Sequence, residues 1–147
     1  MAILIRALCV RDWPALSALF LQVRSQTFTW NRNTPFHLSD LEQQIAGEAV
    51  SVALNEAGQL VGFISLWRVD QFIHHLYVDR QWQGLGIGHQ LLQSLPGWPH
   101  TRYQLKCLQL NQSAAGFYRA CGFIDVGTGC DEDGEYIVFE FSTRNRS

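Results

Sequence analysis

The residues best suited to chemistry are three glycines, Gly84, Gly86 and Gly88, which alternate with apolar side chains. We call residues 84–88 the glycine loop. They follow a β-rich apolar run that ends at Val78, and a helical pattern begins at Ile87. Glycine lets the backbone approach a ligand closely and adopt positive φ values. The start of the helix presents unpaired N–H groups and a positive dipole end to the same space. The segment therefore predicts an anion site that suits a phosphate group.

Two common phosphate-binding motifs do not fit this segment. A Walker A loop has Lys and then Ser or Thr after its last glycine, whereas His89 and Gln90 follow Gly88. The dinucleotide fingerprint G-x-G-x-x-G, if it began at Gly84, would need a glycine where His89 stands. The chain is therefore expected to bind its phosphate in another way.

The pattern that remains is Gln81-x-x-Gly84-x-Gly86. It resembles the Q/R-x-x-G-x-G/A motif of the GNAT superfamily of acyl-CoA-dependent N-acyltransferases. A glycine-rich turn between a strand and a helix is the alternative for this motif taken alone. A second motif downstream resembles the family segment N-x-x-A-x-x-F-Y-x-x-x-G-F. It is matched at Asn111, Ala114, Phe117, Tyr118, Gly122 and Phe123. The chain is identified as a member of this superfamily because both motifs occur in the family's order.

The second motif also has the features of a helix. Asn111 is a good N-cap residue. Ala114, Phe117 and Tyr118 recur at the i, i+3, i+4 spacing of one helix face. Gly122 is suited to the position just after the last turn.

Composition limits the possible classes of protein. A chain of 147 residues with 47% hydrophobic residues predicts one domain, over residues 1–147, with a proper core. The formal net charge is −2 and Lys106 is the one lysine, which predicts neither nucleic acid nor a membrane as a partner. No apolar stretch approaches the roughly 20 residues that a membrane helix needs. We expect a cytoplasmic protein.

Four cysteines stand at positions 9, 107, 121 and 130, without a C-x-x-C pair. This spacing suggests neither a zinc site nor a redox dithiol, and no metal is predicted. We expect reduced packing residues, with Cys107 and Cys121 in core elements.

Apolar periodicity predicts an order of strands and helices in which Asp12 caps the first helix, from Trp13 and Pro14, and Ser39 caps the second. An aromatic loop at 27–37 lies between these helices and is the first candidate for an acceptor pocket. The expected strands are 3–8, 50–55, 60–68, 71–78, 103–110, 123–127 and 136–141, and the expected helices begin near residues 13, 39, 87 and 112, the second of them ending at about Ala46 before Gly47.

The resemblance implies an α/β (α+β) GNAT fold. This is a mixed, mostly antiparallel sheet of about seven strands, flanked by about four helices, whose parallel fourth and fifth strands splay apart. It also implies acetyl-CoA (coenzyme A) as the cofactor, with the pantetheine arm in the gap as a surrogate strand. The implied cofactor-binding residues are Leu76, Tyr77 and Val78 along the strand, Asn111, and the diphosphate-binding N–H groups of Gln83, Gly84, Leu85, Gly86, Ile87, Gly88 and His89. Simple helix capping is the alternative role of Asn111.

The implied reaction moves an acetyl group from acetyl-CoA to a primary amine by direct attack, through a tetrahedral intermediate. A base must deprotonate the amine, because an alkylamine is mostly protonated at neutral pH. His74 is favoured and His75 is the fallback, since adjacent strand residues face opposite ways and one alone should line the acceptor side. A histidine that fills a half-buried strand face is the alternative.

Tyr118 matches the family's general-acid tyrosine, which donates to the leaving thiolate, although an aromatic pair with Phe117 in the core is also possible. The Leu76 N–H is a candidate for stabilising the oxyanion. The expected acceptor is a small-molecule or protein amine, and the protein is expected to be a monomer or a homodimer.

Residues that could choose the acceptor are ambiguous. The acidic run 131–135 would attract a cation, but Asp133-Gly134 also indicates a hairpin tip. Trp30, Phe36, Trp67 and Trp98 would favour an aromatic or amino-acid acceptor, but each of them also suits the core. A non-catalytic acyl-CoA-binding or sensing module is the alternative function.

Overall fold

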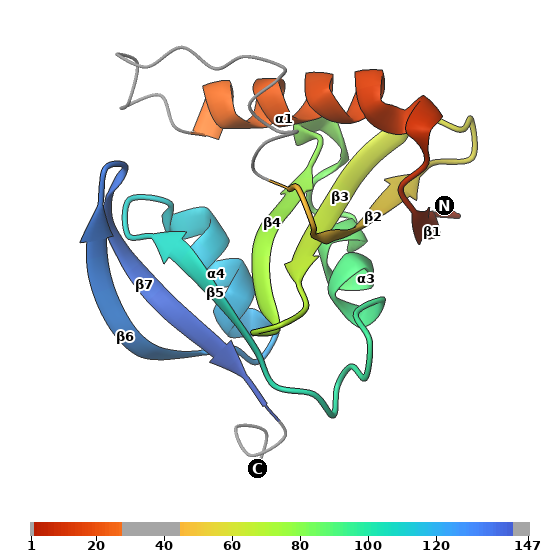
Figure 1. Cartoon of the computed structure of the whole chain (residues 1–147). Helices are drawn as coiled ribbons and strands as arrows, with labels where there is room; N and C mark the ends of the chain where they lie inside the picture. The colour runs from red at the N-terminus through yellow and green to blue at the C-terminus, as the bar shows by residue number, and fades with distance from the viewer. Residues whose placement is uncertain (1, 28–44, 143–147) are drawn as a thin grey trace.

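A seven-stranded mixed sheet organises the chain in a computed structural model that describes residues 2–27 and 45–142 (Figure 1). The strands are β1 (Leu4–Ala7), β2 (Ala49–Leu54), β3 (Leu60–Trp67), β4 (Phe72–Val78), β5 (Tyr103–Leu108), β6 (Ile124–Asp131) and β7 (Gly134–Phe141). The α-helices among these residues are α1 (Trp13–Thr27), α3 (Ile87–Gln93) and α4 (Gln112–Ala120), and the short 3₁₀ turns are η1 (Val10–Asp12) and η2 (Arg80–Trp82). None of the described helices is long and apolar enough to cross a membrane.

The sheet runs in the order β1-β2-β3-β4-β5-β7-β6, and every neighbouring pair is antiparallel except β4 and β5. The parallel pairing covers two residue pairs alone, Phe72 with Gln104 and Ile73 with Leu105. Beyond them β4 stays on β3 as far as Val78, while β5 stays on β7. The two strands therefore separate at their carboxyl ends, which confirms the predicted splay.

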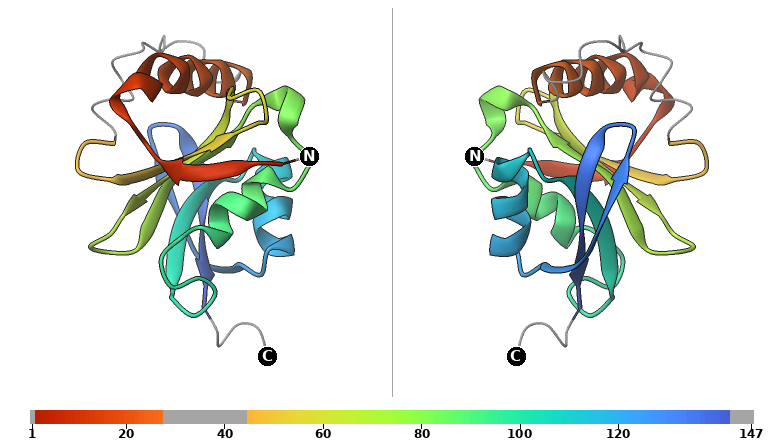
Figure 2. Two further views of the ribbon diagram at one scale, coloured as in Figure 1. Left: turned by 90° about the vertical axis from the view of Figure 1, so that its right-hand side faces the viewer. Right: turned by 90° about the vertical axis from the view of Figure 1, so that its left-hand side faces the viewer.

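Helices cover both faces of the sheet (Figure 2). On one face α1 packs Leu16, Leu19 and Phe20 against β2 and β3, where Val52 and Phe63 are fully buried. On the other face α3 and α4 cover a larger core built from inward residues of β3, β4, β5 and β7. Alternation along the strands supplies both cores, because successive side chains point to opposite faces.

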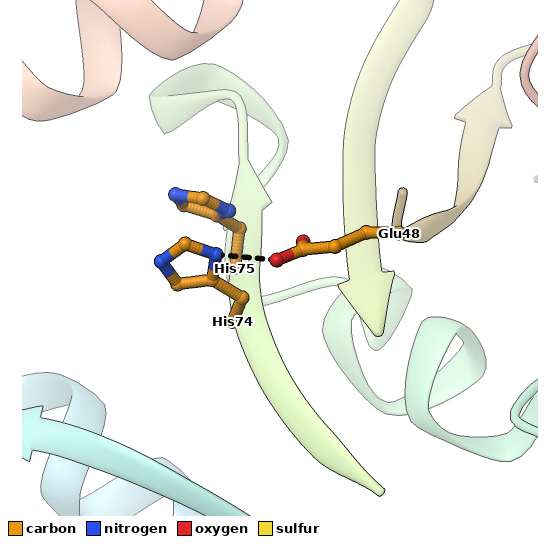
Figure 3. Close-up of side chains that lie close together, drawn as sticks. All are labelled: Glu48, His74 and His75. Atoms are coloured by element: carbon orange, nitrogen blue, oxygen red, sulfur yellow. Dashed lines mark hydrogen bonds and ion pairs between the residues drawn. The ribbon is translucent and has the colours of Figure 1, made fainter. Parts of the chain in front are cut away.

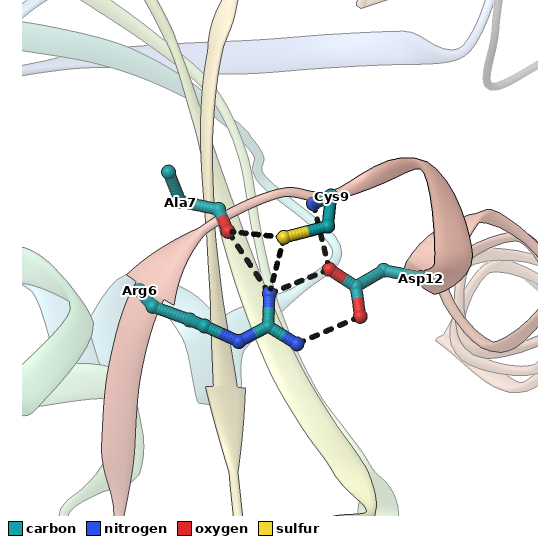
Figure 4. Close-up of polar contacts among 4 residues, drawn as sticks. All are labelled: Arg6, Ala7, Cys9 and Asp12. Carbon is teal, nitrogen blue, oxygen red and sulfur yellow. Dashed lines mark hydrogen bonds and ion pairs between the residues drawn. The ribbon is translucent and has the colours of Figure 1, made fainter.

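The chain enters α1 through a polar cluster at the end of β1 (Figure 4). Asp12 accepts two bonds from the Arg6 guanidinium, at 2.7 and 2.9 Å. It also accepts the backbone N–H of Cys9 at 2.7 Å. The prediction that Asp12 caps α1 is therefore wrong: its carboxylate closes the 3₁₀ turn before the helix, and it ties that turn to β1.

Another difference concerns the bounds of a strand. The strand expected at 123–127 continues to Asp131, because pairing with β7 carries it through Gly127 and Gly129. Periodicity could not indicate this, since glycines and polar residues interrupt the apolar pattern. The second expected helix, 39–46, lies outside the described residues except at its end, where Ile45 and Ala46 form a turn. The aromatic loop 27–37 likewise lies outside them, apart from Thr27 at the end of α1.

We expect the Asp12 cluster to make the protein less stable in acid. The Arg6 guanidinium holds the pKa of Asp12 down at about 2, against an ordinary value of 3.8. Because the folded state keeps this carboxylate ionised, its contribution is present above about pH 4 and is lost as the pH falls towards 2. Asp12→Asn should lower the free energy of unfolding at pH 7 by about 2 kcal/mol and flatten its decline between pH 4 and 2.

Urea unfolding at a series of pH values measures both effects. Asp125→Asn is the matched control, because Asp125 also accepts two bonds from one arginine, Arg119. Both partners of that pair are about half exposed, so the control should change stability much less. Equal effects of the two variants would contradict the structural role of Asp12.

Candidate active site

A cavity of about 1030 Å³ opens where β4 and β5 separate. Its walls come from β4, the glycine loop, β5, the start of α4 and the β6–β7 turn. Strands that part in this way leave backbone N–H and C=O groups without ladder partners, and such groups need another partner when they are buried. The cavity thus lies where the β4–β5 pairing has ended, between one strand that stays on β3 and another that stays on β7.

The glycine loop adopts the conformation that its glycines allow. Gly84 and Gly86 have φ values of +79° and +85°, a region that other residues rarely adopt. Gly86 is the N-cap of α3, and the first helical bond runs from the N–H of Gln90 to Gly86 O at 3.0 Å. The preceding N–H groups of the helix therefore have no acceptor within it.

Gly88 is needed for a different reason, namely close packing of α3 on α4. A Cβ at this position would lie 3.0 Å from Cζ of Phe117. Gly88 thus lets the first turn of α3 pack closely against the ring of Phe117, the residue before Tyr118.

Hydrogen bonds at the end of β4 hold the loop in place. Asp79 accepts the N–H of Gln81 at 2.9 Å and so caps η2. The side-chain amide of Gln83 donates to Val78 O at 3.0 Å. A ligand that paired with β4 would therefore have to share this carbonyl with Gln83 or displace its side chain.

Most of the predicted site residues line this one cavity. They are His74, Leu76, Tyr77, Val78, Gln83, Gly84, Gly86, Ile87, Gly88, Asn111 and Tyr118, together with the fallback His75. Leu85 and His89 are exposed and are not among the lining residues. Their backbone N–H groups remain part of the predicted anion site, but these two residues do not line the cavity.

Both histidines of β4 lie on the same side of the strand, which corrects the expectation that one alone would line the cavity (Figure 3). The register of β4 on β3 shifts here, since Ser65 pairs with His75 and Leu66 with Ile73. His74 is thus the extra residue of a β-bulge, where strict alternation of side chains fails. The two ring centroids lie 4.1 Å apart.

Each histidine has its own polar partner. His75 is 3% exposed, and its Nδ1 lies 2.8 Å from Oγ of Ser65 on β3. Nδ1 of His74 lies 2.7 Å from Oε2 of Glu48, the residue just before β2. Glu48 could not be predicted as a site residue, because a lone glutamate 26 residues upstream of His74 belongs to no motif.

Tyr118 is buried on the core face of α4 and lines the cavity. Burial raises the pKa of Tyr118 above its ordinary value, so the phenol stays protonated and serves as a hydrogen-bond donor. Burial also raises the pKa of Cys107, to about 11. Because a thiol with this pKa is protonated at neutral pH, Cys107 is not a thiolate nucleophile.

Asn111 acts as the predicted helix cap. Its side-chain oxygen accepts the N–H of Ala114 at 3.2 Å. The same residue lines the cavity, and its side-chain NH₂ group remains a donor for a ligand.

The acidic run is a hairpin tip, in which Asp131 pairs with Gly134 and accepts the N–H of Asp133 at 2.9 Å. Asp131 and Asp133 nevertheless line the cavity. Trp98 is partly buried and packs against the core, where it stacks on Phe141 with centroids 4.0 Å apart. Trp67 is 39% exposed at the end of β3, and Trp30 and Phe36 lie outside the described residues.

The mixed sheet, its splayed parallel strands and the glycine loop together define the fold of the N-acetyltransferases. Residues 22–138 match the sequence model of the acetyltransferase (GNAT) domain family. The chain belongs to this family. A comparison with curated protein sequences gives no match.

Several solved structures share the fold. The apo form of YjaB from Escherichia coli is 24% identical, with a TM-score of 0.77 over 96% of this chain and 98% of that one. The PaiA N-acetyltransferase from Thermoplasma acidophilum, solved with coenzyme A, is 18% identical, with a TM-score of 0.75 over 97% and 99%. A spermidine N-acetyltransferase SpeG chimera from Vibrio cholerae and hSSAT is 16% identical, with a TM-score of 0.73 over 100% and 99%.

We expect Gly86→Ala to destabilise the protein although there is open space beside Gly86. No atom lies within 4 Å of a Cβ built there, so the cost arises from the positive φ value, at about 1–2 kcal/mol. Gly116→Ala is the matched control, since that glycine lies within α4 with equally open space and without a positive φ. It should stabilise the protein by roughly 0.5–1 kcal/mol. Urea unfolding distinguishes the two, and equal effects would contradict the left-handed conformation at Gly86.

Proposed function

We propose that this chain is an N-acetyltransferase that moves an acetyl group from acetyl-CoA to a primary amine, by direct attack through a tetrahedral intermediate. The observation that carries the proposal is the cavity between the splayed strands, since it brings the glycine loop, both histidines and Tyr118 to one space. Membership of the acetyltransferase family supports the reaction class. We also propose that residues 1–147 act as a single domain.

We infer one direction for acetyl-CoA in the cavity. The diphosphate would accept hydrogen bonds from the N–H groups of residues 83–89 at the start of α3. The pantetheine amides would pair with Leu76, Tyr77 and Val78, where β4 has no neighbour on the β5 side. Asn111 lines the same cavity from the start of α4 and would donate its side-chain N–H to this arm.

His74 is the proposed general base. At neutral pH an alkylamine, with a pKa of about 10, is mostly protonated and cannot attack the thioester. His74 lines the cavity and is more exposed than His75, so the amine reaches it more readily. His75 is the fallback, and its burial against Ser65 favours a structural role.

Tyr118 is the proposed donor to the departing sulfur. The reference pKa of a thiol is about 8.5, below that of a phenol at about 10, and burial raises the pKa of Tyr118 further. Complete proton transfer to the thiolate is therefore uphill. We infer that Tyr118 stabilises the developing thiolate by a hydrogen bond, while the N–H of Leu76 stabilises the oxyanion.

The acceptor is proposed to be a small-molecule or protein amine that carries positive charge. Asp131 and Asp133 line the cavity, and a cationic substrate would be attracted to them. A solved protein of the same fold is named a spermidine N-acetyltransferase, which makes a polyamine a reasonable first acceptor to test.

We expect acetyl-CoA to bind the purified protein and to release free thiol when an amine is added. Calorimetry measures the binding. A thiol-detecting reagent then follows turnover with spermidine, kanamycin, tyramine and a lysine peptide, with buffer alone as the control. Absence of binding would refute the proposal. Binding without release by any amine would instead favour an acyl-CoA sensor.

We expect Tyr118→Phe to lower kcat by about 10²-fold and to leave the affinity for acetyl-CoA nearly unchanged, because the hydrogen bond forms only as sulfur departs. Tyr103→Phe is the matched control, since the buried Tyr103 hydroxyl donates to Pro96 O and does not line the cavity. The control should keep its turnover. An unchanged kcat in Tyr118→Phe would remove this residue from the mechanism.

A further inference from the structure

We propose that Glu48 is a positioning residue for the general base. Its carboxylate holds the His74 imidazole in the tautomer and orientation that accept a proton from the amine. This inference rests on the proposed function and adds to it a residue that neither motif contains. The two side chains come from segments 26 residues apart, the turn before β2 and the bulge of β4, and they meet at 2.7 Å (Figure 3).

The position of Glu48 is set by the backbone on both sides. Gly47 precedes it with a φ of +81°, and the N–H of Glu48 donates to Ile45 O at 2.9 Å, closing the turn. Ala49 then begins β2 and pairs with Leu66 on β3. The backbone of Glu48 is therefore fixed at the start of β2, which β3 separates from the bulge of β4.

Burial of the carboxylate makes the contact with His74 important. The Glu48 side chain is 5% exposed, whereas that of His74 is 38% exposed. A buried carboxylate needs hydrogen bonds to offset its lost hydration. Oε2 has His74, but Oε1 has no hydrogen-bond partner among the described residues. His74 is thus the partner that the structure provides for this charge.

The contact determines which nitrogen of His74 is the base. An ionised carboxylate only accepts hydrogen bonds, so Nδ1 of His74 must carry the hydrogen. In the neutral ring the lone pair is then on Nε2. The uncharged amine attacks the acetyl carbon, the C=O π electrons move onto the oxygen, and the proton of the amine N–H passes to Nε2. The C–S bond then breaks, and its electron pair leaves with the thiolate. The imidazolium that results lies against the negative charge of Glu48.

The second histidine does not take this role. Nδ1 of His75 faces the neutral hydroxyl of Ser65 at 2.8 Å, and the centroids of the His75 and His74 rings lie 4.1 Å apart. Two imidazolium ions at this separation would repel each other. The carboxylate beside His74 therefore favours the charge on that ring. The other titratable groups that line the cavity are Lys106, Cys107, Tyr118, Asp131, Asp133, Tyr77 and Tyr136.

A shared metal ion is the competing explanation for this cluster. One ligand atom each from Glu48, His74 and His75 all lie within 4.8 Å of one another. Tetrahedral zinc holds its ligand atoms about 3.3 Å apart. The 2.7 Å between Nδ1 of His74 and Oε2 of Glu48 is a charge-assisted hydrogen-bond length instead. The geometry favours a shared proton over a shared ion.

The first test is spectroscopic and needs no substrate. Nitrogen NMR of ¹⁵N-histidine-labelled protein, with the His74→Ala variant to assign the signal among the five histidines, reports which ring nitrogen is protonated. In the unmodified protein at pH 8 we expect His74 with hydrogen on Nδ1. Hydrogen on Nε2 would overturn the inference, even if every Glu48 variant failed to fold.

The second test is kinetic and uses the amine that gives the fastest thiol release. Glu48→Gln should lower kcat by about 10- to 100-fold with little change in the KM for acetyl-CoA, and Glu48→Asp should recover part of the loss. Because both residues act as one unit, the Glu48→Gln/His74→Ala double variant should be no slower than His74→Ala alone. Additive losses would overturn the inference.

Glu140→Gln is the matched control. Glu140 is a largely buried glutamate paired with Arg102 and Gln104, and it does not line the cavity. It should keep its kcat. Activity that disappears in EDTA and returns with Zn²⁺ would favour the metal and overturn the shared-proton inference. Absence of thiol release by the unmodified protein would instead refute the proposed function, whatever the NMR result.

Discussion

The parting of β4 from β5 is the constraint on which the rest of the structure depends. Two residue pairs hold the parallel strands together, and each strand then stays with its other neighbour, β3 or β7. Those antiparallel ladders keep the sheet intact while its centre opens. The helices α3 and α4 pack on one face of the sheet at this gap and line the cavity, so they close it on that side.

The β-bulge at His74 is the second departure from regular geometry. A regular strand places one of two adjacent side chains on each face, and it would turn one histidine away from the cavity. The bulge brings both rings to one side. It also moves His74 within reach of Glu48, which lies on the β2 side of the sheet. One extra residue in β4 thus connects a buried carboxylate to the place where β4 loses its partner.

Much of the fold could be predicted from sequence, because it depends on local patterns. Glycines with a fixed spacing gave the loop, and Asn111 and Gly122 gave the ends of α4. The remainder depends on pairing between distant segments. Gly129 sits in β6 because β7 pairs with it, and Glu48 meets His74 through the sheet register. Single-residue propensities contain neither fact.

The candidate site divides in the same way. Tyr118 and most of the glycine loop line the predicted cavity, since a motif keeps its residues at fixed spacing along one helix or turn. The prediction that one histidine alone would line the cavity was wrong, because a bulge leaves no periodic signal in a run such as His74-His75. The prediction that Asp12 caps α1 was wrong for a related reason. Its carboxylate binds the guanidinium of Arg6 on β1, a contact that no local pattern indicates.

The proposed base and donor require opposite electrostatic surroundings, and the structure separates them accordingly. Tyr118 lies on the buried face of α4, where burial raises its pKa and keeps the phenol neutral. His74 lies at the bulge beside a carboxylate, where a positive charge is stabilised. In the proposed reaction Tyr118 keeps its proton and gives the departing thiolate a hydrogen bond, whereas His74 takes the proton of the amine. The proposed reaction would therefore depend on the contact of 2.7 Å between His74 and Glu48, which the sheet register sets.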